Sequence, residues 1–338
     1  MTTMKAFVLT RYGGPDVAEL RDIEVPAPGS GQIRVRVHAA GLNPVDFKTR
    51  EGKIKLIHDY PLPAVMGNEF AGTVEALGEG VTEFAKGDRI FSRITKGTMG
   101  GLAEFVCVRA EHVAKIPEAL DFEKAGAVPL AGLTALQALR DELAVKPGFR
   151  VFISAGAGGV GTFAIQIAKK LGAFVATTAS SRGAELVRRL GADVVIDYTT
   201  TKFEDELKDY DGAFDLLGGD DLRRTFQVVK PGAKVVSVAG MPEPLTAQKD
   251  LSRGGLLPLL FWFASFSLRR IARRHGVTYR YLFMHPSGED LTLLASWLER
   301  GELEVIVDKV FPLAEAKEAF KYLEAGRAKG KVVVRVTS

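Results

Sequence analysis

The sequence predicts an α/β protein whose later part contains a doubly wound parallel sheet. Two observations carry this prediction: short apolar strands alternate with amphipathic helices after Pro129, and a glycine-rich turn joins the first of those strands to its helix. A third observation distinguishes the earlier part, where apolar and polar residues alternate at period two. Strand–helix alternation is typical of parallel sheets covered by helices, and period-two alternation is typical of half-buried strands.

The earlier part is predicted to be β-rich up to about residue 125. Residues 32–40 (QIRVRVHAA) alternate strictly and predict a strand. Glycine-rich turns at residues 78–80 and 100–101 separate further short apolar segments. These segments span residues 71–77, 88–94 and 102–108.

The first predicted strand of the later part covers residues 150–154. The helix after it has one apolar face, made by Val160, Phe163, Ala164, Ile167 and Leu171. Lysines in its last turn and Gly172 after it are typical of a helix C-terminus. Further strands are predicted at 174–178, 194–197, 214–216 and 234–238, followed by a strand at 305–310, a helix at 313–323 and a strand at 331–336.

The composition fits a folded protein of about two domains. The 338 residues are 46% hydrophobic and 25% charged, which argues against disorder. The formal net charge is +4, but no basic run is interleaved with aromatic residues, so nucleic acid is not an expected partner. The single cysteine, Cys107, excludes an internal disulfide and a multi-cysteine zinc site, and is compatible with a reducing compartment.

We expect a soluble, cytoplasmic protein without a membrane span. The first residues lack the apolar core of a secretory signal, and no stretch reaches about 18 uninterrupted apolar residues. The most apolar segment, residues 256–268, is followed by four arginines at 269, 270, 273 and 274. Two interpretations are open: a buried helix or pocket wall, or a peripheral membrane contact through residues 256–274.

A nucleotide-binding turn is predicted at residues 153–161 (ISAGAGGVG). Gly156, Gly158 and Gly161 form G-x-G-x-x-G directly after a strand and at the start of a helix, the context that makes this pattern specific. The first glycine allows a tight turn, the second lets the backbone approach a diphosphate, and the third lets helix and strand pack closely. The backbone N–H groups at the helix start, with Gly159 and Val160 among them, would bind phosphate. The alternative is a glycine-rich turn without a ligand.

The residues after the second strand favour NADPH over NADH. NADH sites have Asp or Glu about 20 residues past the glycines, whereas this chain has Ala-Ser-Ser-Arg at 179–182. Ser180 and Arg182 suit a 2′-phosphate, although an arginine at a helix start is also common on a solvated surface. Tyr198, at the tip of the third strand, is expected to pack against the adenosine end of the cofactor.

Other nucleotide-binding classes fit the sequence less well. A P-loop needs lysine after its last glycine, where this chain has Thr162. A methyltransferase usually has an acidic residue at the end of the second strand, which is missing here. Tyr198 and Lys202 match the Y-x-x-x-K of short-chain dehydrogenases, but they follow a strand and do not lie on a long helix.

Seven motifs follow one another nearly from end to end: GLNPVD at 41–46, MGNEFAG at 66–72, GDR at 87–89, PLAGLTA at 129–135, AGAGGVG at 155–161, LGADVVIDY at 190–198 and GKVVV at 330–334. In this order they resemble the medium-chain dehydrogenase/reductase superfamily, in its zinc-free quinone oxidoreductase and enone (alkenal) oxidoreductase branch. The resemblance implies a Rossmann NADPH-binding domain at 129–299, inserted in a GroES-like catalytic domain made of residues 1–128 and 300–338. It also implies a homodimer.

The resemblance implies chemistry without a metal. The zinc branch of the superfamily holds its catalytic zinc with a cysteine and a histidine where this chain has Asn43 and Asn68. Zinc prefers thiolate, imidazole or carboxylate ligands, so we expect no metal site. The expected reaction is hydride transfer to a lipophilic α,β-unsaturated carbonyl or a quinone, because these acceptors are already electrophilic.

The resemblance also implies roles for particular residues. Asn43 would lie near the nicotinamide ribose and Thr134 beside the nicotinamide, while Lys55 would donate a hydrogen bond to the substrate oxygen. The plainer alternatives are a turn residue before a proline for Asn43 and a surface cation for Lys55. Enoyl thioesters are not expected, because Ile54 stands where their reductases have a tyrosine acid.

A basic turn near the C-terminus completes the implied site. Arg327, Lys329 and Lys331 match a turn that helps to hold the cofactor phosphate in relatives, and Arg327 is the best candidate of the three. An exposed basic turn without a ligand is the alternative. The second function considered for the whole chain is a non-catalytic NADPH-binding protein of the same fold, with a sensor or structural role.

Overall fold

The computed structural model describes residues 2–337 and divides into two compact units. The β-rich unit extends to Leu133 and resumes at Pro286, and the nucleotide unit comprises Thr134–His285.

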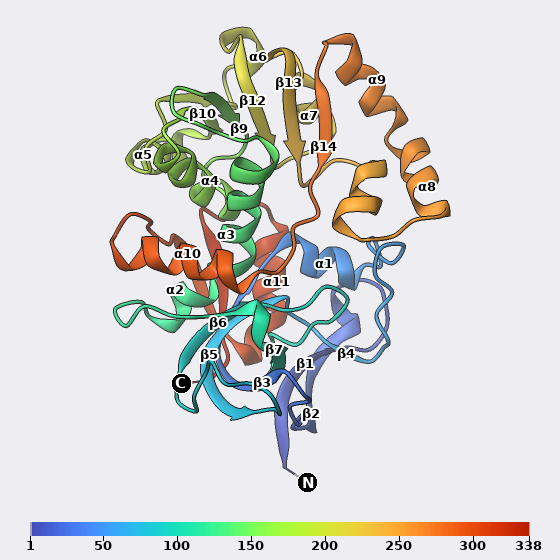
Figure 1. The fold of residues 1–338 in the computed structure, drawn as a ribbon, viewed down its shortest axis with the longest axis vertical. Helices are drawn as coiled ribbons and strands as arrows, with labels where there is room; N and C mark the ends of the chain where they lie inside the picture. Colours follow the sequence, from blue (N-terminus) through green and yellow to red (C-terminus); the bar gives the residue numbers. More distant parts are fainter. Residues whose placement is uncertain (1, 338) are drawn as a thin grey trace. The chain divides into compact units, whose positions relative to one another are not determined.

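The nucleotide unit is built on a sheet of six parallel strands (Figure 1). In sheet order they are β11 (Val194–Asp197), β10 (Phe174–Ala179), β9 (Arg150–Ile153), β12 (Tyr210–Asp215), β13 (Val229–Ser237) and β14 (Thr278–Tyr281). Counted along the chain this is the order 3-2-1-4-5-6 of a doubly wound fold. Val151, Phe152 and Ile153 are all completely buried, as expected for a strand in a parallel sheet that is covered on both faces.

Helices make the crossovers between these parallel strands. In chain order they are α4 (Gly159–Lys170), α5 (Ser181–Arg189), α6 (Phe203–Glu206), α7 (Gly219–Thr225), the π-helix η4 (Thr246–Asp250), α8 (Leu256–Ala264) and α9 (Phe266–Arg274). α3 (Pro129–Leu136) runs across the division between the units, and the π-helix η3 (Gln137–Glu142) follows it.

The β-rich unit contains two sheets of mainly antiparallel strands. The larger has β15 (Val307–Pro312), β16 (Lys331–Arg335), β3 (Gln32–Leu42), β5 (Glu69–Leu77), β6 (Arg89–Arg93) and β8 (Val113–Lys115), with β7 (Phe105–Arg109) also paired to β3. The smaller has β2 (Ala18–Glu24), β1 (Thr3–Leu9) and β4 (Ala64–Val65). Val334 of β16 lies opposite Ala40 of β3, so the last strand of the chain returns to one of the first.

Short helices surround these sheets. They are η1 (Pro15–Val17), α1 (Pro44–Arg50), η2 (Ala110–His112), α2 (Phe122–Gly126), α10 (Gly288–Glu299), η5 (Leu313–Glu315) and α11 (Ala316–Glu324).

The predicted α/β fold class is confirmed. Ile33, Val35 and Val37 of β3 are completely buried while Arg36 between them is exposed, which is the predicted alternation. The predicted strands of the parallel sheet overlap β9 to β13, although β12 and β13 begin four and five residues earlier than predicted. β14 and the pair β1–β2 were not predicted.

The units divide at 133/134 and 285/286, whereas the sequence placed the divisions at 128/129 and 299/300. Helix α10 explains the second difference, because it packs against β8 and η2 of the β-rich unit. A Cβ on Gly288 would lie only 2.6 Å from the Val113 carbonyl oxygen. An amphipathic pattern predicts that a helix is half-buried but does not say which unit covers it.

Among residues 2–337, no helix combines the length and the apolar character that a bilayer crossing requires. The apolar segment 256–268 folds into α8 and the start of α9. Phe261 and Leu268 are buried there, but Leu256 and Phe263 are 67% and 64% exposed. The interpretation of this segment as a buried helix is therefore wrong for most of its large side chains.

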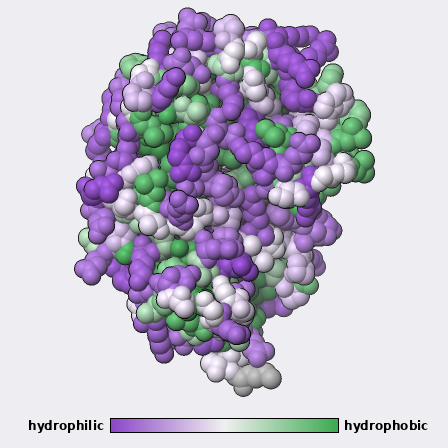
Figure 2. Space-filling view, viewed as in Figure 1, coloured by the Kyte–Doolittle hydropathy of each residue, from purple (hydrophilic) through white to green (hydrophobic). Residues whose placement is uncertain are grey.

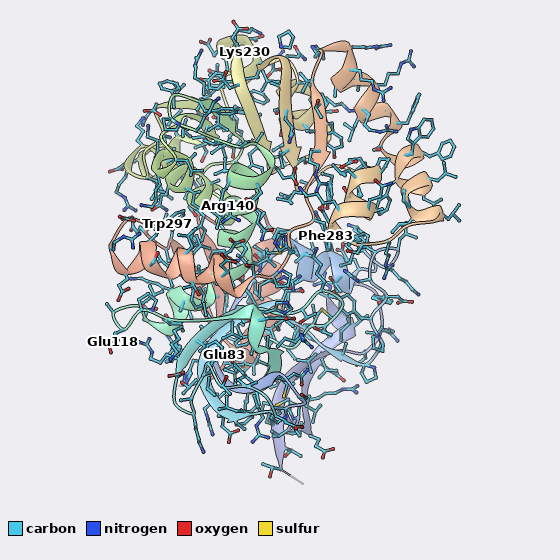
Figure 3. All side chains as sticks on the ribbon, viewed as in Figure 1. Glu83, Glu118, Arg140, Lys230, Phe283 and Trp297 are labelled. Atoms are coloured by element: carbon cyan, nitrogen blue, oxygen red, sulfur yellow. The ribbon has the colours of Figure 1, made fainter. Side chains whose placement is uncertain are left out.

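A buried ionic network joins β14 to the segment before α8. The guanidinium of Arg280 lies 3.2 Å from Glu142, 3.1 Å from Glu243 and 2.5 Å from Asp250. The backbone N–H of Phe283, which is labelled in Figure 3, donates to Asp250 Oδ2 at 2.9 Å. Arg280 therefore balances Glu243 and Asp250, and it shares Glu142 with Lys249, whose Nζ lies 2.6 Å from that carboxylate. Such carboxylates would be costly to bury alone.

We expect Arg280→Met to lower the free energy of unfolding by about 3–5 kcal/mol, because it removes the cation that pairs with the buried carboxylates of Glu243 and Asp250. Urea unfolding of the full chain measures this change. Arg300→Met is the matched control: Arg300 pairs with Glu302 on the surface, and its loss should leave stability nearly unchanged. Equal midpoints for the two variants would contradict the structural role of the network.

Candidate active site

A strained turn follows β9 in the nucleotide unit. Ala155 has a φ of +51°, a left-handed conformation that costs a residue with a Cβ on the order of 1 kcal/mol. Thr178 of β10 holds this turn: its Oγ1 accepts from the Ala155 N–H at 2.9 Å, and its carbonyl oxygen accepts from the Gly156 N–H at 3.0 Å. The turn is thereby fixed to the neighbouring strand before α4 begins.

The three predicted glycines serve different purposes. A Cβ on Gly156 would lie 2.3 Å from Thr177 Oγ1, and one on Gly161 would lie 2.4 Å from the Ala155 carbonyl oxygen. Both positions therefore require glycine for close packing. A Cβ on Gly158 would meet only the Ala155 carbonyl oxygen, at 3.3 Å. Gly158 therefore leaves open space, as the approach of a diphosphate to the backbone requires.

The start of α4 presents free backbone donors to that space. Gly158 is the N-cap and has no side chain to cap the helix, and the Thr162 N–H donates to its carbonyl oxygen at 3.0 Å. The N–H groups of Gly159, Val160 and Gly161 precede this first helical bond, at the positive end of the helix dipole. This arrangement is an anion-binding site by its geometry.

The carboxyl ends of β10 and β11 bring the other predicted nucleotide residues to the same edge of the sheet. β10 pairs in parallel with β9 on one side and with β11 on the other, so the carboxyl ends of all three strands lie at one edge. Ser180 is the N-cap of α5, Arg182 in its first turn is exposed, and Tyr198 directly after β11 is 62% exposed. The structure thus gathers Gly158, Ser180, Arg182 and Tyr198 along one edge.

The carboxylate of Asp197, at the end of β11, is bound within its own turn. It accepts hydrogen bonds from the Thr199 N–H at 2.9 Å and the Thr199 hydroxyl at 2.6 Å. These hydrogen bonds lower the pKa of Asp197. No carboxylate stands at the end of β10 itself, where residues 179–182 read ASSR.

A buried aspartate at this edge was missed by the sequence analysis. Asp215 ends β12, and its Oδ2 accepts from Ser237 Oγ at 2.6 Å and from the Gly218 N–H at 3.0 Å. Burial raises the pKa of Asp215. Ser154 at the end of β9 accepts from the Leu216 N–H at 2.8 Å, which ties the loop after β12 to the turn after β9. The sequence signal that points to Asp215 is its place between an apolar strand and the Gly218-Gly219 pair.

The β-rich unit contains a buried polar cluster, the Glu69 cluster, made of Asn43, Asp46, Asn68, Glu69 and Lys331. Glu69 Oε1 accepts from Asn43 Nδ2 at 2.6 Å and from Lys331 Nζ at 2.7 Å. Glu69 Oε2 accepts from the backbone N–H of Leu130 in α3 at 2.6 Å. Lys331 Nζ also donates to Asn43 Oδ1, so both polar atoms of the Asn43 amide are held.

The motif at residues 41–46 positions this cluster. A Cβ on Gly41 would lie 2.4 Å from Glu69 Oε1, so only glycine lets the carboxylate sit there. Asn43 begins α1, and its backbone N–H donates to Asp46 Oδ2 at 2.7 Å. Asn68 Nδ2 donates to Asp46 Oδ1 at 2.6 Å.

Burial controls the ionisation of Asp46. It raises the pKa of Asp46 to about 6, although the hydrogen bonds from Asn68 and Asn43 act in the opposite direction. Burial likewise lowers the pKa of the nearby Arg93 guanidinium and raises that of the Tyr60 hydroxyl. Asp46 is therefore a carboxyl group that changes charge near neutral pH.

Of the three residues predicted to lie near the substrate and the nicotinamide end, Lys55 and Thr134 lie outside the Glu69 cluster. Lys55 is 56% exposed, its Nζ is 3.8 Å from Asp59 and it lies 5.3 Å from the centre of the Tyr12 ring. Thr134 is buried in α3. Their predicted roles toward the substrate and the nicotinamide stay predictions.

The structure separates the basic residues near the C-terminus. Arg327 is exposed after α11, as a basic turn requires. The grouping of Lys331 with this turn is wrong, because the pairing of β16 with β3 carries Lys331 into the Glu69 cluster, where its side chain is 3% exposed.

Known proteins resemble both parts of the chain. Residues 29–118 match the model of the alcohol dehydrogenase GroES-like domain, and residues 190–334 match that of the zinc-binding dehydrogenase family. A chloroplastic NADPH-dependent alkenal/one oxidoreductase of Arabidopsis thaliana is 36% identical over 98% of this chain and 79% of its own length. The chain belongs to the quinone and alkenal/one oxidoreductase branch of the medium-chain dehydrogenase/reductase superfamily. It is an oxidoreductase.

Solved structures agree with this assignment to the superfamily. The quinone oxidoreductase of Coxiella burnetii has a TM-score of 0.86 at 32% identity, and the match covers 99% of this chain and all of that one. A mycobacterial protein in complex with NADPH has a TM-score of 0.82 at 28% identity, with 98% of this chain and all of that one covered.

The Glu69 cluster does not fit the catalytic zinc of this superfamily. Asn43 and Asn68, at the positions where the resemblance implies zinc ligands, have amides bonded to Glu69, Lys331 and Asp46. The Lys331 ammonium already neutralises the Glu69 carboxylate that a metal would need. Within the described part of the chain, no three or more His, Cys, Asp or Glu side chains group in a way that could hold a metal ion.

Asp46 should make the stability of the protein fall as pH rises from about 4 to about 6. Its pKa is raised in the folded state, so the folded protein holds a proton there that the unfolded chain has released. The free energy of unfolding of the native protein, minus that of Asp46→Asn, should therefore fall by about 2–3 kcal/mol over this window and stay level above it. Urea unfolding at several pH values measures both, and a difference that does not vary with pH would contradict the assignment.

Proposed function

We propose that the chain reduces an α,β-unsaturated carbonyl or a quinone by hydride transfer from NADPH, without zinc. One observation carries the proposal: the open Gly158 position at the start of α4 lies at the same sheet edge as Ser180 and Arg182, where a carboxylate for NADH is missing. This edge suits a diphosphate and a 2′-phosphate together.

The residues present fit NADPH. The N–H groups of Gly159 and Val160 would bind the diphosphate, Ser180 and Arg182 the 2′-phosphate, and Tyr198 the adenosine end. Arg327 and Thr134 are further proposed contacts. When bound, NADPH supplies the hydride for the acceptor. NADPH in the descriptions of the Arabidopsis relative and of the mycobacterial structure supports this choice.

Asn43 is proposed to contact the nicotinamide ribose. Glu69 and Lys331 hold both polar atoms of its amide, and the amide nitrogen also lies 3.5 Å from the Gly41 carbonyl oxygen. Its fixed orientation favours a positioning role toward a ribose hydroxyl.

The acceptor gains negative charge on its oxygen as it is reduced, so a donor there stabilises the transition state. Lys55 is the proposed donor, because its exposed ammonium is held only loosely, 3.8 Å from Asp59. A proton from solvent completes the reduction. Enones, alkenals and quinones need no metal to become electrophilic, which suits a chain whose Glu69 carboxylate is paired with a lysine.

Turnover distinguishes this proposal from a non-catalytic NADPH-binding protein. We expect NADPH absorbance to fall with at least one of a panel of 2-alkenals, cyclic enones and quinones, and a metal chelator to leave the rate unchanged. Product identification separates C=C reduction from quinone reduction. NADPH binding without consumption of any panel member would favour the sensor or structural role, and a chelated enzyme rescued by zinc would contradict the metal-free reaction.

Arg182→Ala should weaken NADPH binding roughly tenfold or more and leave NADH binding nearly unchanged, because only NADPH carries the 2′-phosphate. Cofactor fluorescence titration measures both affinities. Arg188→Ala, which removes an exposed arginine from the other end of α5, is the control and should change neither. An equal loss for both cofactors would show that Arg182 does not read the phosphate.

A homodimer located in the cytoplasm is also part of this proposal. Light scattering and cell fractionation are the corresponding measurements.

A further inference from the structure

Helix α8 exposes apolar side chains where a folded domain normally presents polar ones. Its sequence, LLPLLFWFA, has no charged residue, and only Phe261 of its side chains is classed as buried. The α8 patch consists of Leu256, Leu259, Leu260, Trp262, Phe263 and, from α9, Phe266, all of them exposed. Figure 2 shows hydrophobic surface gathered at the edge where Figure 1 places α8. A helix that is apolar all round normally lies in a core or in lipid.

Positive charge borders the α8 patch. From Leu251 to Gly288 the chain has no Asp or Glu, whereas arginines outside the buried Arg280 network occur at 253, 269, 270, 273 and 274. Leu268 and Ala272 of α9 are buried in the core of the nucleotide unit, while Arg270, Arg273 and Arg274 are exposed. The two helices therefore present apolar and basic surface next to each other.

Trp262 and Arg269 join these two surfaces. The Arg269 guanidinium lies 5.3 Å from the centre of the Trp262 ring and donates to the Trp262 carbonyl oxygen at 2.8 Å. Its Nε also donates to Ser265 Oγ at 3.0 Å. Tryptophan and arginine with an apolar body and a polar end are favoured at the boundary between headgroups and acyl chains.

We propose that the α8 patch and the arginines of α9 bind the surface of an anionic lipid membrane, with α8 in the boundary between headgroups and acyl chains. Charge complementarity selects this occupant over a second copy of the chain. A contact with a second copy would need carboxylates from outside residues 251–288 to pair with these arginines, because this stretch contains none. Anionic headgroups supply that countercharge, and the acyl boundary accepts the apolar side chains.

Vesicle flotation of the full chain tests this proposal. The protein should float with vesicles of phosphatidylcholine containing about 30% phosphatidylglycerol, far less with phosphatidylcholine alone, and less again as salt rises, because salt screens the arginines. Retention in the soluble fraction with both kinds of vesicle would overturn the proposal, as would equal binding to both.

Two sets of variants separate the apolar from the basic contribution. Leu259→Ser with Phe263→Ser, and Arg270→Gln with Arg273→Gln and Arg274→Gln, should each lower the vesicle partition coefficient roughly tenfold or more. The arginine set removes only exposed side chains, so it tests the proposal even where the serine set unfolds. Leu20→Ser on β2 and Arg223→Gln on α7 are matched exposed controls and should bind like the unmodified chain.

Light scattering of the same samples addresses self-association. The unmodified chain and the serine set should have the same oligomeric state. A serine set that dissociates a dimer, together with unmodified protein that ignores vesicles, would assign the patch to a contact between copies and overturn the membrane proposal.

Discussion

The buried ion pair between Glu69 and Lys331 is the contact on which the polar site of the β-rich unit depends. It joins residues 262 positions apart, one at the start of β5 and one at the start of β16. Each charge alone would cost several kcal/mol to bury. Hydrogen bonds from Asn43 and from the backbone of Leu130 satisfy the remaining capacity of the carboxylate. The Glu69 carboxylate of β5 thus binds residues at the start of α1, in the first turn of α3 and at the start of β16.

The same pair is one reason why the Glu69 cluster does not fit a zinc ion. The positive charge beside Glu69 belongs to a side chain of the C-terminal strand. A lysine offers hydrogen-bond donors but no vacant coordination position, so it can orient the Asn43 amide without activating a carbonyl as a Lewis acid would. Asp46 is the second carboxylate of the cluster, and burial raises its pKa to about 6.

The nucleotide unit depends on a different constraint, the close approach of backbone segments at one edge of its sheet. The strained Ala155 turn, the glycines that pack around it and the Asp215 loop are all held by hydrogen bonds between neighbouring strand ends. The segment between β13 and β14 is bound to β14 through Arg280 and contains the exposed helix α8. A hydrogen-bonded sheet edge and an apolar, arginine-rich surface therefore belong to the same unit.

The sequence by itself determined the parallel sheet, the glycine turn and the gathering of Ser180, Arg182 and Tyr198 with it. These features are local: periodicity and motif lie within short stretches, and neighbouring parallel strands must place their ends together. The tertiary structure alone decided that Lys331 is buried beside Glu69, that α10 joins the β-rich unit and that α8 is exposed. These features depend on which distant segments pack together. From the local sequence alone, Lys331 suits a basic turn, α10 suits a helix of either unit, and α8 suits a core helix.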